Sequence, residues 1–171
     1  MFNNIEEAIA EIYRVADLYN EDRPWIVEAE DKEAREKELA EVEKTLGFKL
    51  TDDYSNLLIR YEVFDTLEGN EFSIDTRDLK KIIEDTEFMH KVRADSGAEP
   101  LPATYHPLGF LNPDWGYYVQ DSKTSEVYSL DLFNKFSKPE KVADNLLGFF
   151  AYAIHGFDQY MKDKQKQSGG K

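Results

Sequence analysis

The segment from residue 143 to residue 161 carries a wide apolar face at helical spacing, and this feature constrains the fold most. The face consists of Leu146, Phe149, Phe150, Ala153, Ile154, Phe157 and Tyr160. Apolar residues that recur every three or four positions predict an amphipathic helix. Because the burial of each large side chain contributes roughly 2 kcal/mol, this helix must pack against a sheet or against another helix.

Two more helices are predicted near the N-terminus. Residues 5–19 repeat apolar side chains at the same spacing, and Asn3 or Asn4 can cap the first turn. Residues 31–46 form a second helix that has only a narrow apolar stripe, so much of it faces water. Gly47 follows this helix at the position where a left-handed C-terminal cap is expected.

The middle of the chain contains two further helical segments. A short helix follows Thr51 or Asp52, either of which can cap it. Residues 78–93 return to helical periodicity, and Asp75 or Thr76 can cap this helix. The side chains predicted to point inward from it are Leu79, Ile82, Ile83, Thr86 and Met89.

Short strands are predicted between and after these helices. Residues 61–74 contain a turn signal between apolar pieces and indicate strands or an irregular hairpin. Residues 106–111, 115–121 and 126–133 are rich in aromatic and branched side chains and predict an antiparallel meander, with a turn at 122–124. The expected class is α+β, with N-terminal helices, a small antiparallel sheet and a C-terminal helix packed on it.

The composition fits one globular domain. The chain has 171 residues, of which 41% are hydrophobic, and this suffices to bury a core. We expect residues 1–162 to form a single domain and residues 163–171 to form a flexible polar tail. The absence of cysteine excludes disulfide bonds and thiolate metal sites. No signal peptide or apolar stretch of spanning length is present, so we expect a cytoplasmic protein.

The net charge of −14 restricts the possible partners. Nucleic-acid binding draws its affinity from lysine and arginine, and anionic membranes attract basic segments, so we expect neither partner. An acidic surface attracts a basic protein and speeds the encounter between the two. Solubility alone would explain the same charge equally well.

The segment from residue 41 to residue 61, EVEKTLGFKLTDDYSNLLIRY, resembles the hallmark of the SUKH superfamily. The hallmark is a helix that ends in leucine-glycine, a short link, and an acidic cap with a tyrosine that open the next helix. Its elements here are Val42, Leu46, Gly47, Leu50, Asp53, Tyr54 and Leu58. The order of later strands and the last helix is also similar, over residues 33–155. The chain departs from the family at Thr51, where a proline is common, and at residues 112–116, where a glycine-rich aspartate segment is reduced.

The resemblance implies a role in protein binding. Members of this superfamily are typically bacterial immunity proteins, which bind and neutralise a cognate toxin, often a nuclease. A minority, which includes fungal cell-wall regulators, are interaction modules in signalling. The resemblance therefore implies a cognate toxin as partner, and the acidic charge favours a basic one. A regulatory scaffold domain is the alternative function.

Six residues near the predicted strands form the candidate partner-binding set. They are Asp114, Trp115, Tyr117, Asp121, Glu126 and Asp131. Carboxylates suit a basic partner, and tryptophan and tyrosine are favoured at interface hot spots. The competing interpretation is that these acids belong to turns and strand edges. A carboxylate pair could also run glycoside hydrolysis, which makes a hydrolase the third possible function. The acidic helix over residues 28–43 is a second candidate surface, unless it is only a solvated helix face.

The three histidines, His90, His106 and His155, do not have the spacing of a metal site, and we expect packing or surface roles for them. The glycines match neither phosphate-binding pattern, and no serine lies in a nucleophile elbow. The sequence therefore indicates no catalytic, cofactor-binding or metal-binding residues, and it favours a protein that is not an enzyme.

Overall fold

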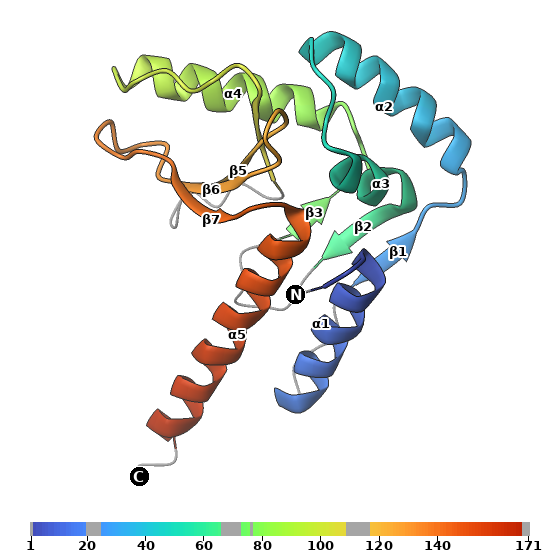
Figure 1. The fold of residues 1–171 in the computed structure, drawn as a ribbon, viewed down its shortest axis with the longest axis vertical. Coiled ribbons are helices and arrows are strands. Elements are labelled where there is room, and N and C mark those ends of the chain that lie inside the picture. The colour runs from blue at the N-terminus through green and yellow to red at the C-terminus, as the bar shows by residue number, and fades with distance from the viewer. Residues whose placement is uncertain (1, 20–24, 66–72, 76, 109–116, 169–171) are drawn as a thin grey trace.

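The computed structural model describes residues 2–19, 25–65, 73–75, 77–108 and 117–168 (Figure 1). The helices in these ranges are α1 (Ile5–Tyr19), α2 (Lys32–Leu46), α3 (Asp52–Arg60), α4 (Lys81–Asp95) and α5 (Leu146–Ser168). The strands are β1 (Ile26–Glu28), β2 (Tyr61–Asp65), β3 (Ser73–Asp75), β4 (Tyr105–Pro107), β5 (Tyr117–Asp121), β6 (Val127–Leu130) and β7 (Glu140–Ala143). This architecture confirms the predicted α+β class.

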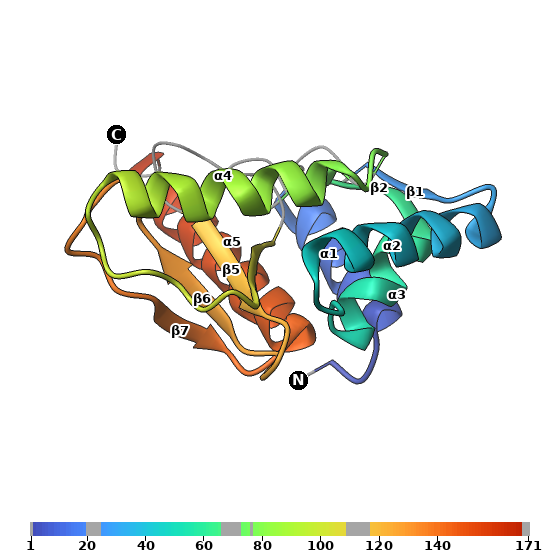
Figure 2. The same ribbon diagram turned by 90° about the horizontal axis from the view of Figure 1, so that it is seen from above.

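The strands form two antiparallel sheets, which lie between two pairs of helices. One sheet has the order β1-β2-β3 and the other is the meander β4-β5-β6-β7. Helices α1 and α5 lie side by side on one side of the sheets, whereas α2 and α4 lie on the other (Figure 1). Figure 2 shows α4 running past the four-stranded sheet toward α2.

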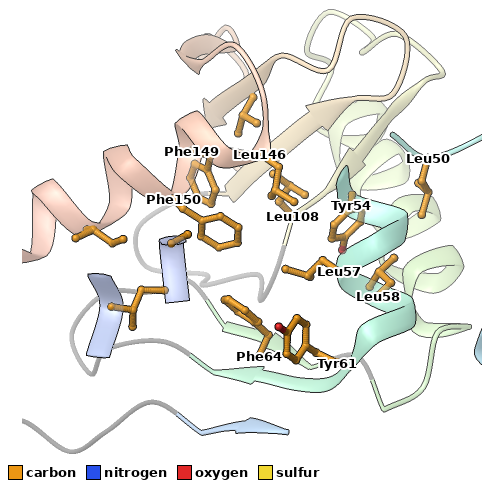
Figure 3. Close-up of a cluster of buried hydrophobic side chains, with 14 of the residues drawn as sticks. Leu50, Tyr54, Leu57, Leu58, Tyr61, Phe64, Leu108, Leu146, Phe149 and Phe150 are labelled. Atoms are coloured by element: carbon orange, nitrogen blue, oxygen red, sulfur yellow. The ribbon is translucent and has the colours of Figure 1, made fainter. Parts of the chain in front are cut away.

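The main core gathers aromatic side chains from both halves of the chain (Figure 3). Phe64 of β2 meets Phe150 of α5 at 5.4 Å between ring centroids, and Tyr61 contacts Phe64 edge-on. Phe149 and Phe150 are at most 1% exposed. The apolar face of the C-terminal helix is therefore buried against α1 and against both sheets at six of its seven predicted positions. The exception is Tyr160, which is 54% exposed.

A second, smaller core lies between α4 and one face of the four-stranded sheet. It includes Met89 of α4, Val119 of β5 and Leu130 of β6, all at most 1% exposed. Tyr118, the neighbour of Val119, instead packs on Phe149 of α5, with 4.7 Å between the ring centroids. The sheet is thus covered on both faces, because successive strand residues point in opposite directions.

Side-chain caps define where several helices begin and end. Asn4 accepts a hydrogen bond from the Glu7 amide at 2.9 Å, and Thr51, the N-cap of α3, accepts one from the Tyr54 amide at 3.4 Å. Gly47 ends α2 with φ 80°, in the left-handed region. The structure therefore selects Asn4 and Thr51 from the predicted alternatives and confirms the predicted role of Gly47.

Two sequence-based boundaries in the middle of the chain were wrong. Helix α4 begins at Lys81, three residues later than predicted, and Lys80 is its N-cap without a side-chain hydrogen bond. Asp75 belongs to β3, and Thr76 lies outside the described residues. Instead, the Asp78 carboxylate accepts a hydrogen bond from the Lys80 amide at 3.0 Å and shapes the preceding turn.

The C-terminal region also differs from the prediction. Ala143 belongs to β7, a strand that the sequence patterns missed, and α5 starts only at Leu146. The third predicted strand of the meander ends early, at Leu130, and a loop follows it. Residues 163–168 were predicted as a flexible tail but continue α5 to Ser168.

Candidate functional site

The structure describes four of the six predicted partner-binding residues, one of them only by its backbone. Asp114 and Trp115 lie outside the described residues. The backbone of Tyr117 opens β5 and pairs with Leu130 of β6, while the Tyr117 side chain is outside the description. The geometry of the predicted set therefore rests on its three remaining carboxylates.

Asp121 is buried and holds the turn between β5 and β6. One carboxylate oxygen accepts hydrogen bonds from the Thr104 hydroxyl at 2.6 Å and from the Lys123 amide at 3.0 Å. The other oxygen accepts one from the Thr124 hydroxyl at 3.2 Å. Because both oxygens are used in these contacts, the carboxylate organises the turn and does not face a partner.

Glu126 lies just before β6 and is held by two neighbours. Its carboxylate accepts hydrogen bonds from the Lys141 ammonium and, at 2.6 Å, from the Tyr128 hydroxyl. The hydrogen bonds from Lys141 and Tyr128 lower the pKa of the Glu126 carboxyl to about 2. A hydrolase that works through two carboxyl groups needs one of them to have a raised pKa. Glu126 has the opposite shift, so its environment does not favour that role.

Asp131 is exposed at the other end of β6 from Glu126. Its carboxylate accepts hydrogen bonds from the Phe133 amide at 3.1 Å and from the Asn134 amide at 3.2 Å. The three carboxylates thus occupy a buried turn, an ion pair and a loop. They do not form one acidic face.

The loop after β6 is held by a buried arginine that sequence reasoning missed. Arg93 of α4 is 2% exposed and donates hydrogen bonds to the carbonyl oxygens of Glu99 at 3.3 Å, Asn134 at 3.2 Å and Ser137 at 2.5 Å. Its position four residues after Met89 continues the inward spacing of the helix, which was the available signal. An arginine at such a position is normally read as a surface residue.

The three histidines have different surroundings in the structure. His90 pairs its Nε2 with the Tyr105 carbonyl oxygen at 3.0 Å and joins α4 to β4. His106 is fully buried, whereas His155 is exposed on α5. In the part of the chain that the structure describes, no group of three or more histidine or acidic side chains could hold a metal ion.

A groove of about 300 Å³ lies between α2 and α4. Its lining residues are Glu38, Glu41, Val42 and Thr45 from α2, Ile83 and Glu84 from α4, and Lys80 at the start of α4. Val42 is 1% exposed and Ile83 is half-buried, so these two side chains provide the apolar floor. We call this feature the acidic groove.

The acidic groove carries an excess of negative charge. Three carboxylates, from Glu38, Glu41 and Glu84, face one ammonium group, that of Lys80. Glu41 has a long ion pair with Lys44, at 3.8 Å, while Glu38 and Glu84 form no salt bridge with another described residue. The groove therefore offers an excess of carboxylates around an apolar floor, which suits a cationic and partly apolar partner.

The wall formed by α2 is fixed by the other buried arginine. Arg35 is 7% exposed and donates two hydrogen bonds to the Leu58 carbonyl oxygen, at 2.8 and 2.6 Å, and one to the Tyr61 carbonyl oxygen at 3.3 Å. These contacts satisfy carbonyl groups that the end of α3 leaves free. They also hold α2 in place, so the groove is preorganised for binding.

A larger hollow of about 420 Å³ lies where α1, α3 and α5 meet, but its charges are mutually compensated. Arg60 pairs there with Glu6 and, at 3.7 Å, with Glu28. The acidic groove, whose carboxylates are mostly unpaired, is therefore the stronger candidate for a binding site.

The comparisons with known proteins leave this site to be judged on its geometry. No model of a known protein family matches the chain, and a search of curated proteins finds no match. Within the described ranges, no helix is long and apolar enough to cross a bilayer.

Proposed function

We propose that this chain is an immunity-type protein that binds a basic bacterial toxin and neutralises it by covering the surface that the toxin needs. The single observation that carries the proposal is the acidic groove, in which three carboxylates and one ammonium group line an apolar floor and Glu38 and Glu84 form no salt bridge with another described residue.

The net charge of the whole chain also supports a basic partner. A net charge of −14 draws a cationic protein toward this surface and raises the association rate at low ionic strength. Nucleases need a basic cleft to hold phosphate groups, so a toxin of this kind would match both the chain's charge and the groove.

The resemblance to the SUKH hallmark adds to the proposal at the level of local structure. The cap of α3 departs from the hallmark, because Thr51 and not an acidic residue provides it. Gly47 adopts the left-handed cap at the end of α2, and Tyr54 is buried in the first turn of α3. These features fit a motif that shapes a scaffold for binding.

The proposal is tested by the products of the reading frames that flank this gene. Each neighbour is expressed in bacteria with and without this chain, and growth and binding are measured by plating and calorimetry. We expect one neighbour to be toxic alone and harmless in the pair. Its affinity should be nanomolar or tighter, and its association rate should fall about tenfold or more between 50 and 300 mM NaCl.

Two results would contradict the proposal. Flanking products that are not toxic, or a toxic product that this chain neither binds nor neutralises, would exclude the immunity role. Binding of a non-toxic neighbour would instead support a regulatory scaffold domain.

A further inference from the structure

The two walls of the acidic groove are helix surfaces whose lining residues recur at helical spacing. On α2 the lining residues Glu38, Val42 and Thr45 are four and three positions apart, and at the start of α4 Lys80 precedes Ile83 by three positions and Glu84 by four. Residues at such spacing form ridges along a helix, and the space between two ridges accepts the ridge of another helix.

We propose that the groove receives a basic amphipathic α-helix of the partner, in the manner of a third helix packed against α2 and α4. One apolar side chain of that helix would rest on Val42 and Ile83. Lysine or arginine side chains three or four positions away would reach Glu38, Glu41 and Glu84. The inference deepens the proposed function and rests on its claim that the partner is a basic protein.

The backbone chemistry of the groove favours a helix over an extended segment. Glu38, Glu41 and Val42 lie inside α2, and residues 83 and 84 lie inside α4, so their backbone groups are used in helical hydrogen bonds. An extended peptide would find no strand edge there, and its own amide and carbonyl groups would lose water without gaining partners. A helix satisfies these groups internally and presents only side chains.

The charges of the groove determine the composition of that helix. Three carboxylates and the single ammonium group of Lys80 leave an excess of negative charge in the groove, and a neutral or acidic helix would not compensate this charge. A helix with cationic side chains on both flanks of an apolar stripe complements the rim and the floor together.

The probe for this inference is a synthetic 15-residue peptide of alanine, leucine and lysine with leucines at every third or fourth position, capped at both ends. A scrambled peptide of the same composition serves as the control, because it has equal charge but no apolar stripe. Binding to the full chain is measured by fluorescence anisotropy at 50 mM NaCl. Circular dichroism reports helix formation, and methyl NMR reports contact with Val42 and Ile83.

Two variants of equal net charge separate the groove from the general acidity of the chain. The first combines Glu38→Gln, Glu41→Gln and Glu84→Gln. The second combines Glu36→Gln, Glu99→Gln and Glu140→Gln, which are exposed positions outside the groove. Each changes the net charge from −14 to −11, because three carboxylates are lost. Denaturant unfolding of both variants checks that the fold is kept.

We expect the patterned peptide to bind at least tenfold more tightly than the scrambled one, to become helical and to shift the methyl signals of Val42 and Ile83. The groove variant should weaken this binding about tenfold, and the control variant less than threefold. Equal binding of the two peptides, equal weakening by the two variants, or methyl shifts confined to other residues would overturn the inference.

The toxin experiment distinguishes a failure of this inference from a failure of the proposed function. If the chain neutralises a toxin and the groove variant neutralises it equally well, the helix-in-groove inference is wrong and the immunity role stands. If the peptide result holds but no flanking product is toxic, the immunity role is wrong while the groove remains a site for a basic helix.

Discussion

At the residue scale, His106 is a titratable side chain that is completely buried. Its ring stacks on Tyr54 at 5.2 Å between centroids and lies 6.2 Å from Phe48. The Nε2 atom is buried and has no hydrogen-bond partner among the described residues. Burial lowers the pKa of His106 from its ordinary 6.5 to about 4, because the imidazolium form would lose its hydration.

The shift in His106 predicts an acid-dependent loss of stability. Between pH 6.5 and pH 4 the unfolded chain binds a proton at this position and the folded chain does not, so unfolding is favoured as the pH falls. The contribution of His106 to the free energy of unfolding should be fully present at pH 7. It should decrease by about 3 kcal/mol by pH 4.

Urea unfolding at pH 7, 5.5 and 4 measures this effect. We expect His106→Phe to keep the ring stack on Tyr54 and to lose stability with acid less steeply than the native chain. His155→Gln, at an exposed position, should follow the native curve, since that side chain is solvated in both states. Parallel curves for His106→Phe and the native chain would refute the prediction.

At the element scale, two glycines in or beside helices have opposite structural roles. Gly47 ends α2 at φ 80°, where an L side chain is strained, although a Cβ there would meet no atom within 4 Å. Gly156 lies inside α5, and a Cβ there would also meet open space. Steric contact is absent at both positions, so backbone preference alone should decide the effect of alanine.

We therefore expect Gly47→Ala to lower the free energy of unfolding by about 1 kcal/mol, because the left-handed conformation is unfavourable for alanine. Gly156→Ala should raise it by about 0.5–1 kcal/mol, because alanine loses less conformational entropy in a helix interior. Denaturant titration of the two variants measures both values. Changes of the same sign would contradict this explanation of the α2 cap.

At the scale of the whole molecule, the charge of −14 opposes the compact state. Surface pairs such as Lys37 with Glu33, at 2.7 Å, contribute little, since both side chains are more than 70% exposed. The remaining negative charges repel one another across the folded surface more strongly than across an expanded chain.

Screening by salt should therefore stabilise the protein. Raising NaCl from 10 to 150 mM shortens the screening length from about 30 to about 8 Å, and we expect Tm to rise by about 2–4 °C. Differential scanning calorimetry measures the change. The variant that combines Glu36→Gln, Glu99→Gln and Glu140→Gln should gain less, because its repulsion is smaller. A fall in Tm with salt would mean that favourable ion pairs outweigh the repulsion.

The sequence indicated only one of the two walls of the acidic groove. The acidic segment over residues 28–43 was predicted as a helix and recognised as a possible surface. Glu28 belongs to β1 instead, and α2, which begins at Lys32, supplies Glu38 and Glu41 to the groove. The wall that carries Ile83 and Glu84 was not recognised as a surface, because the helical spacing of Ile83 predicted that this side chain belongs to the core. Only the packing of α4 beside α2 leaves that side chain half-buried in a groove.

The sequence by itself determined the features that depend on neighbours three or four residues apart. These are the helices, the cap at Gly47 and the apolar face of α5, and local hydrogen bonding and periodicity suffice to specify them. Tertiary structure alone decided which charged groups are used inside and which remain for a partner. Arg93 and Asp121 became internal supports, whereas Glu38 and Glu84 form no salt bridge within the described part of the chain, because burial depends on contacts between segments that are distant in the sequence.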